Sequence, residues 1–112
     1  MIYYIKKGES TDYQEIKKNL SKCQGLNKVR NHLPINTNES LAHLHKKLDV
    51  AYNLIKNGSV LICEARFKGG GRADIYCLDT DVAYEILCSE KEANILNKAK
   101  VYPVKEIKMV KV

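Results

Sequence analysis

Residues 60–90 read VLICEARFKGGGRADIYCLDTDVAYEILCSE, and this stretch decides the fold that the sequence predicts. Its three apolar runs, 60–66, 72–78 and 82–88, are typical of strands that are covered on both faces of a sheet. Glycines 69–71 separate the first two runs, and the acidic turn Asp79-Thr80-Asp81 separates the last two. The stretch therefore predicts three consecutive strands, the last two of which form a hairpin.

The hairpin places two acidic residues opposite each other. If Asp79 and Thr80 form a two-residue loop, Asp74 lies directly across from Glu85 on one face. Opposed side chains in such a pair have Cβ atoms about 4.5–5.5 Å apart. Two carboxylates at that separation repel each other unless a proton or a cation lies between them, and Mg²⁺ is the natural cation for oxygen ligands. The alternative interpretation is that both residues belong to a solvated face of the hairpin.

Length and charge narrow the class of protein. The chain has 112 residues, enough for one domain with one core. Its 19 Lys and Arg residues against 13 Asp and Glu residues give a formal net charge of +6. This excess favours a polyanionic partner such as DNA or RNA. Moderately basic domains without such a partner are the alternative.

The four cysteines, Cys23, Cys63, Cys77 and Cys88, lack the short spacing of a zinc site. Three of them lie in apolar runs, where a reduced thiol behaves as a small core residue. No segment approaches the roughly 18 apolar residues of a membrane span, and the first residues do not read as a signal peptide. We therefore expect no membrane association and a cytoplasmic, intracellular location, in the host cell if the protein is viral.

The remaining segments alternate between helix and strand patterns. Residues 2–5 read as a short strand ended by Gly8, and a helix capped by Ser10, Thr11 or Asp12 runs to about Lys22. Residues 26–38 read as a connection. A helix capped by Ser89 ends before Pro103, and residues 104–112 read as a last strand.

A strong helix is predicted from about Asn38 to Lys56. Apolar residues recur along it at spacings of three and four, which predicts one buried stripe made of Leu41, Leu44, Leu48, Tyr52 and Ile55. With these helices and strands, the predicted fold class is α/β (α+β).

The order of these elements resembles the PD-(D/E)XK nuclease superfamily, over roughly residues 36–112. The stretches that carry the resemblance are Glu39-Ser40 with His43 downstream, Glu64, Arg72-Ala73-Asp74-Ile75 and Glu85-Ile86-Leu87-Cys88-Ser89. In detail they are similar to CoiA-like and Holliday-junction-resolvase-like small nucleases. Residues 1–35 are then an N-terminal β-α extension packed on this core.

The resemblance implies a restriction-endonuclease-like mixed sheet flanked by helices, and Mg²⁺- or Mn²⁺-dependent hydrolysis of phosphodiester bonds in DNA. It implies that Asp74 and Glu85 bind the metal, with Glu64 as a further ligand and Glu39 assisting. The implied partner is nucleic acid, with DNA favoured over RNA, and the protein is expected to act as a homodimer. The alternative is an inactive nuclease fold that binds nucleic acid or serves as an assembly module.

One position departs from the family pattern. The lysine expected two residues after Glu85 is replaced by Leu87, which cannot donate a hydrogen bond. A lysine from the first helix of the core, Lys46 or Lys47, is expected to substitute for it. Lys46 is favoured because an offset of seven residues places it on the same side as Glu39. Nucleic-acid contacts are expected from Lys46, Lys47, Lys68, Arg72, Gly70 and Gly71.

Overall fold

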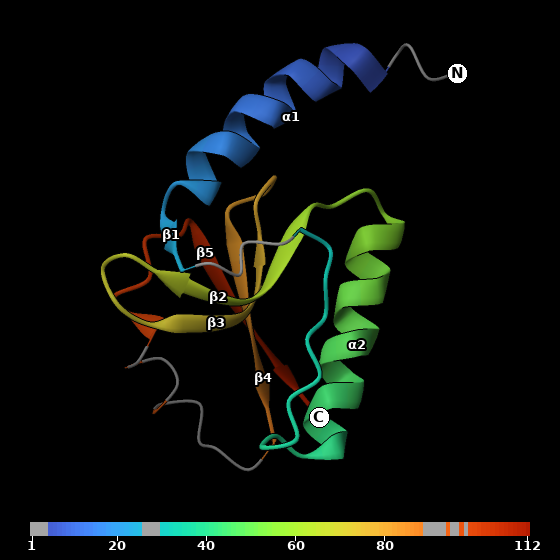
Figure 1. Ribbon diagram of the computed structural model, residues 1–112, viewed down its shortest axis with the longest axis vertical. Helices are drawn as coiled ribbons and strands as arrows, with labels where there is room; N and C mark the ends of the chain where they lie inside the picture. Colours follow the sequence, from blue (N-terminus) through green and yellow to red (C-terminus); the bar gives the residue numbers. More distant parts are fainter. Residues whose placement is uncertain (1–4, 26–29, 89–93, 95–96, 98) are drawn as a thin grey trace.

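A computed structural model describes residues 5–25, 30–88, 94, 97 and 99–112 of the chain, with side chains described from Tyr13 onward in the first helix. In these residues the chain forms two long helices and one five-stranded sheet (Figure 1). The elements are α1 (Ile5–Leu20), β1 (Cys23–Gln24), α2 (Leu41–Lys56), β2 (Leu61–Phe67), β3 (Arg72–Cys77), β4 (Val82–Leu87) and β5 (Glu106–Lys111).

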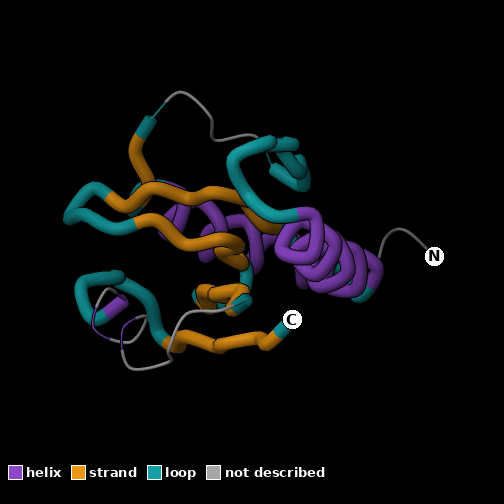
Figure 2. Tube along the Cα trace, turned by 90° about the horizontal axis from the view of Figure 1, so that it is seen from below, coloured by secondary structure: helices purple, strands orange, loops and turns teal. Residues whose placement is uncertain are grey.

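The sheet has the strand order β1-β2-β3-β4-β5. Strands β1 to β4 pair antiparallel, whereas β5 runs parallel to β4, so the sheet is mixed. Figure 2 shows β2 and β3 lengthwise and β4 nearly end-on, which is the appearance of a strongly twisted sheet. The predicted α/β (α+β) class and the mixed sheet are thus confirmed, and each of the three central strands matches its predicted range within one residue.

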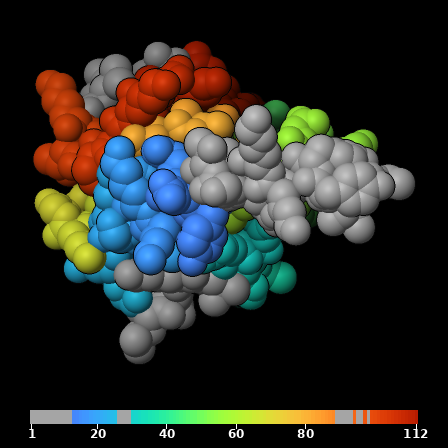
Figure 3. Space-filling model, turned by 90° about the horizontal axis from the view of Figure 1, so that it is seen from above, coloured from blue at the N-terminus to red at the C-terminus, as the bar shows by residue number. Residues whose placement is uncertain are grey.

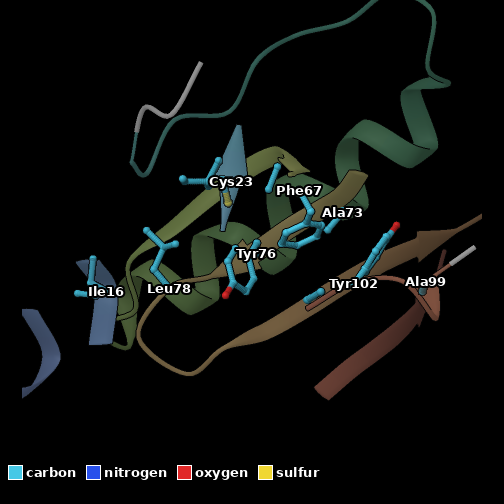
Figure 4. Close-up of a cluster of buried hydrophobic side chains, with 11 residues drawn as sticks. Ile16, Cys23, Phe67, Ala73, Tyr76, Leu78, Ala99 and Tyr102 are labelled. Carbon is cyan, nitrogen blue, oxygen red and sulfur yellow. The ribbon is translucent and has the colours of Figure 1, made fainter. Parts of the chain in front are cut away.

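The sheet separates two apolar clusters. Tyr76 belongs to one and its neighbour Ile75 to the other, because successive side chains of a strand point to opposite faces. The smaller cluster includes Ala51 of α2. The larger one includes Ile16 of α1, and Figure 4 shows the rings of Phe67, Tyr76 and Tyr102 within it. The Phe67 ring centroid lies 5.1 Å from that of Tyr76 and 5.0 Å from that of Tyr102.

Helix α2 faces the sheet with a different side from the one predicted. Its N-cap is Ser40, whose hydroxyl accepts a hydrogen bond from the His43 N–H, so the helix begins after Glu39. The buried residues of α2 are Lys47 and Ala51. Most of the predicted stripe is exposed, with relative accessibilities of 67% for Leu41, 50% for Leu48, 59% for Tyr52 and 37% for Ile55.

The N-terminal segment also differs from the prediction. Helix α1 already includes Ile5 and continues through Gly8, so the glycine does not end a strand there, and residues 2–4 lie outside the described part. Residues 13–25 cover one end of the molecule (Figure 3). Buried Asn19 donates a hydrogen bond of 2.7 Å to the Leu78 carbonyl oxygen, and Cys23 opens the short strand β1, which the sequence did not reveal.

Residues 30–38 form a connection, as predicted. The proposed cap at Ser89 lies outside the described residues, and of the helix that it would begin only Asn94, Asn97 and Ala99 are described, all helical. Of the three cysteines predicted to be core residues, Cys63 and Cys77 are buried, whereas Cys88 is exposed, so the prediction is wrong for Cys88. Across the described ranges, no helix is both long and apolar enough to cross a membrane.

Because α2 exposes most of the predicted apolar stripe, a leucine-to-alanine substitution should destabilise the fold less on that stripe than in the core of the sheet. Leu61 is fully buried in β2, and its replacement by alanine should lower the free energy of unfolding by about 2–5 kcal/mol. Leu48→Ala on the exposed face of α2 should change it by no more than about 0.5 kcal/mol. Urea unfolding followed by circular dichroism measures both. Equal losses would mean that the Leu48 face is covered.

Candidate functional site

A fully buried lysine lies at the centre of the most polar part of the fold. Lys47 projects from α2 toward the sheet, and its side chain has no solvent exposure. Its Nζ donates a hydrogen bond of 3.1 Å to Oε2 of Glu39 and one of 3.0 Å to Oε2 of Glu64. A buried ammonium costs several kcal/mol unless it is paired, so these two carboxylates are what permits this side of α2 to pack inward.

The Lys47 pairing extends into a chain of alternating charges. At one end, His43 Nδ1 lies 2.6 Å from Glu39 Oε1, and His43 Nε2 lies 3.5 Å from Asp74 Oδ2. At the other end, Arg72 lies 3.5 Å from Glu64 Oε1. In this series of contacts, each acidic side chain therefore lies beside a basic one. We call it the charged network, and its members are Asp74, His43, Glu39, Lys47, Glu64 and Arg72.

Local backbone conformation brings the acids of the network together. Glu39 precedes the N-cap of α2, so its side chain reaches along the first two turns to both His43 and Lys47. Glu64 has a φ of 56°, a left-handed conformation that a residue other than glycine rarely adopts. The alternation of β2 side chains between the two faces of the sheet shifts by one residue at Glu64. This is seen from Ile62 and Ala65, which belong to the same cluster although they are three residues apart.

The network shifts the pKa values of its members in different directions. Burial alone raises the pKa of Glu39, but hydrogen bonds from His43 and Lys47 outweigh burial and leave it below its ordinary value. Burial alone lowers the pKa of Lys47, but the bonds to Glu64 and Glu39 raise it overall, so Lys47 is charged at neutral pH. Burial raises the pKa of Asp74 more than the Ile86 N–H and His43 lower it. The folded state therefore disfavours the charged form of Asp74 and favours that of Glu39.

The hairpin keeps the predicted register over residues 75–77 and 82–84, and the carboxylates of Asp74 and Glu85 contact different groups. The pairs Ile75–Tyr84, Tyr76–Ala83 and Cys77–Val82 follow that register, although the turn spans four residues and not two. The Asp74 carboxylate accepts a hydrogen bond of 2.7 Å from the N–H of Ile86, the residue after Glu85. Glu85 is buried, and its Oε1 lies 2.9 Å from the Tyr102 hydroxyl. Each of the two carboxylates therefore has a hydrogen-bond partner of its own.

The prediction that Lys46 lies on the same side of the helix as Glu39 is wrong. Lys46 is on the surface of α2 and lies 3.8 Å from Asp49, whereas Lys47 contacts Glu39. The prediction assumed that Glu39 lies inside the helix, and it lies before the N-cap. Leu87 is 2% exposed, so a lysine at that position would be buried in the core.

The other predicted contact residues surround the β2–β3 turn. Lys68 is exposed, and Gly70 and Gly71 have φ values of 109° and 89°, which the tight turn requires. A Cβ atom on Gly71 would clash with the ring of Tyr102. Sequence reasoning missed Tyr102 and gave His43 no role in the site. The four-residue spacing of Glu39 and His43 was the available signal for their contact.

The acids of this site are possible ligands for a divalent cation. Carboxylate oxygens are the ligands that Mg²⁺ prefers, and the partly buried Asp74 is a suitable donor. Glu39 and Glu64 are held by Lys47, and the described part of the chain contains no ready group of three or more His, Cys, Asp or Glu residues with the geometry of a metal site. The oxygen atoms of these acids are therefore suitable ligands for the cation. In this arrangement the positive charge beside Glu39 and Glu64 comes from Lys47.

Comparisons of the chain with protein-family models, curated proteins and solved structures found no match. The site is therefore interpreted from its own geometry.

Removal of the Lys47 ammonium should destabilise the fold strongly at neutral pH. Lys47→Met leaves the partly buried Glu39 and Glu64 without their cation and should cost about 3–5 kcal/mol of unfolding free energy at pH 7. Lys46→Met is the matched control, because Lys46 is one residue away and exposed, and should cost less than about 0.5 kcal/mol. Denaturant unfolding of both variants compares these costs.

The Lys47→Met deficit should also depend on pH. The lowered pKa of Glu39 means that its pairing stabilises the fold above its ordinary value of 4.5 and is lost as the pH falls through the lower folded value. The raised pKa of Lys47 means that its contribution is present below 10.5 and is lost at higher pH. The deficit should therefore shrink below pH 4. A deficit that is equal at pH 3.5 and pH 7 would contradict this account.

Asp74 should behave in the opposite way. Because the folded-state pKa of Asp74 is raised, its ionised form costs stability above its ordinary value of 3.8, and stability returns as the pH falls through the folded value. Asp74→Asn keeps an oxygen that can accept the Ile86 N–H bond but removes the charge. Its melting temperature at pH 7 should equal or exceed that of the wild type. A loss of more than about 1 kcal/mol would show that the charge itself is structural.

Proposed function

We propose that this protein is a nuclease of PD-(D/E)XK type that hydrolyses phosphodiester bonds of nucleic acid, DNA in preference to RNA, with Mg²⁺ or Mn²⁺. The observation that supports this proposal most is the charged network, in which the buried Lys47 ammonium lies between Glu39 and Glu64. His43 of the same helix lies between Glu39 and Asp74 of β3. The order of a helix, three antiparallel strands and a strand parallel to the third agrees with the order on which the resemblance rests.

In this proposal Lys47 takes the role that Leu87 cannot fill. Its raised pKa keeps the ammonium charged at neutral pH, and a fixed positive charge stabilises the negative charge that develops on a phosphate under attack. His43 lies between Glu39 and Asp74 with one ring nitrogen toward each, a position in which an imidazole can hold a proton or pass it between two carboxylates.

Three carboxylates are assigned to the cation. Asp74, Glu64 and Glu85 would hold it, with Asp74 as the first candidate because burial raises its pKa and a bound cation would stabilise its charged form. When bound, a divalent cation supplies a water of lowered pKa and neutralises charge on the scissile phosphate. Glu39 assists by orienting Lys47 and His43, both of which it contacts.

A second candidate function is nucleic-acid binding without cleavage. Two observations favour it: Leu87 is buried where the motif expects a lysine, and Lys47 already neutralises two of the acids. Under this candidate the network only stabilises the fold, and the basic surface alone contacts the phosphates.

A cleavage assay separates the two functions. Linear, single-stranded and branched DNA are incubated with Mg²⁺ or Mn²⁺ and with wild type, Asp74→Asn, Lys47→Met or the control Lys46→Met, at a temperature where each variant is folded. For a nuclease, we expect cleavage by wild type and by Lys46→Met, and at least a hundredfold slower cleavage by the other two, which lose a charge at the reaction centre.

Binding measured in EDTA completes the test. Its log affinity should fall linearly with log salt concentration, because contacts to phosphates release counterions. Salt-dependent binding with no cleavage of any substrate would support the binding module. Absence of binding at low salt would contradict both functions.

A further inference from the structure

Three polar side chains form a row across neighbouring strands next to the charged network. In the sheet register, Gln24 of β1 pairs with Arg66 of β2, and Arg66 pairs with Arg72 of β3. Directly opposed residues project from the same face, so the two guanidinium groups leave the sheet side by side. Like charges in such a pair destabilise a sheet unless an anion is shared between them. The two opposed arginines of the row therefore repel each other unless an anion lies between them.

The two arginines differ in their neighbours. Arg72 lies 3.5 Å from the Glu64 carboxylate and is half-exposed. Arg66 is exposed, and within the described ranges no carboxylate forms an ion pair with it. The exposed side chain of Lys68 follows shortly after Arg66 in the chain. The Arg66 guanidinium and those N–H groups of Arg72 that do not face Glu64 are thus available for an external anion.

The row opens into a pocket with a volume of about 510 Å³, lined by Gln24, Arg66, Gly71, Arg72, Val101 and Tyr102. Glycine is required at residue 71, because a Cβ atom there would overlap the Tyr102 ring. The Tyr102 hydroxyl lies 2.6 Å from the Arg72 carbonyl oxygen and 2.9 Å from Glu85 Oε1, and its proton is shared between these acceptors. The pocket wall therefore contacts two strands that carry proposed site carboxylates.

We propose that this pocket binds a phosphate group of a nucleic-acid strand between Arg66 and Arg72. A guanidinium presents paired N–H donors whose fork matches two phosphate oxygens, so two guanidiniums on one face suit one phosphate. Bound there, the phosphate removes the repulsion between the opposed arginines. That the ligand is a nucleic acid rests on the proposed function, whereas the anion site rests on the row and the pocket.

The test measures binding in EDTA, so that it does not depend on cleavage. Single-stranded 12-nucleotide DNA with a 5′-hydroxyl and the same strand with a 5′-phosphate are titrated against wild type, Arg66→Gln, Arg66→Lys and Arg30→Gln. Arg66→Gln keeps a polar side chain at an exposed position, so the fold should be retained. Arg30→Gln is the matched control, because Arg30 is also exposed and its loss changes the net charge equally.

Arg66→Gln should weaken DNA binding at least tenfold and reduce the salt slope by about one. Arg30→Gln should weaken it less than twofold, and Arg66→Lys should lie between. If the pocket takes an end of the strand, the 5′-phosphate strand binds wild type more tightly, and Arg66→Gln removes that preference. If it takes an internal phosphodiester, both strands bind wild type equally and Arg66→Gln weakens both.

Equal effects of Arg66→Gln and Arg30→Gln would overturn the pocket proposal. Such a result together with Mg²⁺-dependent cleavage would leave the proposed function intact. Conversely, Arg66→Gln could lose DNA binding while the wild type cleaves no substrate. That result would support the phosphate pocket and contradict the nuclease proposal. The two proposals can therefore fail separately.

Discussion

The desolvated ammonium of Lys47 is the constraint on which the arrangement of α2 and the sheet depends. Burying one charge is tolerated only where opposite charges and hydrogen bonds replace water, and Glu39 and Glu64 supply both. Meeting this requirement fixes which side of α2 faces β2 and β3. It also leaves the leucine-rich side of the helix exposed, so the polar pairing outweighs the ordinary preference for burying leucine.

The same constraint accounts for the unusual backbone at Glu64. A residue in regular pleat would point its side chain away from its neighbour Cys63, which lies in the cluster under α2. The left-handed conformation allows Glu64 to reach Lys47 from within a strand otherwise filled with core residues. Strain of this kind is of order 1–3 kcal/mol and persists where surrounding contacts maintain it, often at functional sites. The network and the strained residue thus indicate the same location.

Much of the sheet could be predicted from the sequence, because apolar runs and turn residues are local signals. The register of β3 and β4 followed from the acidic turn, although the turn is longer than predicted. The prediction that Lys46 lies on the same side of the helix as Glu39 is wrong because it depended on where α2 begins, and the N-cap is Ser40. The buried face of α2 could not be found from periodicity, since it contains a lysine whose partners lie at other places in the chain. Strand β1 has only two residues and gives no periodic signal.

We propose that the acids around Lys47 form a reaction centre and not only a structural ion-pair network. The most direct measurement is the anomalous diffraction of a crystal soaked in Mn²⁺. The account predicts an anomalous peak within coordinating distance of the Asp74 carboxylate, beside Lys47. A crystal that shows Mn²⁺ only at surface carboxylates, with the bonds of Lys47 to Glu39 and Glu64 unchanged, would contradict it.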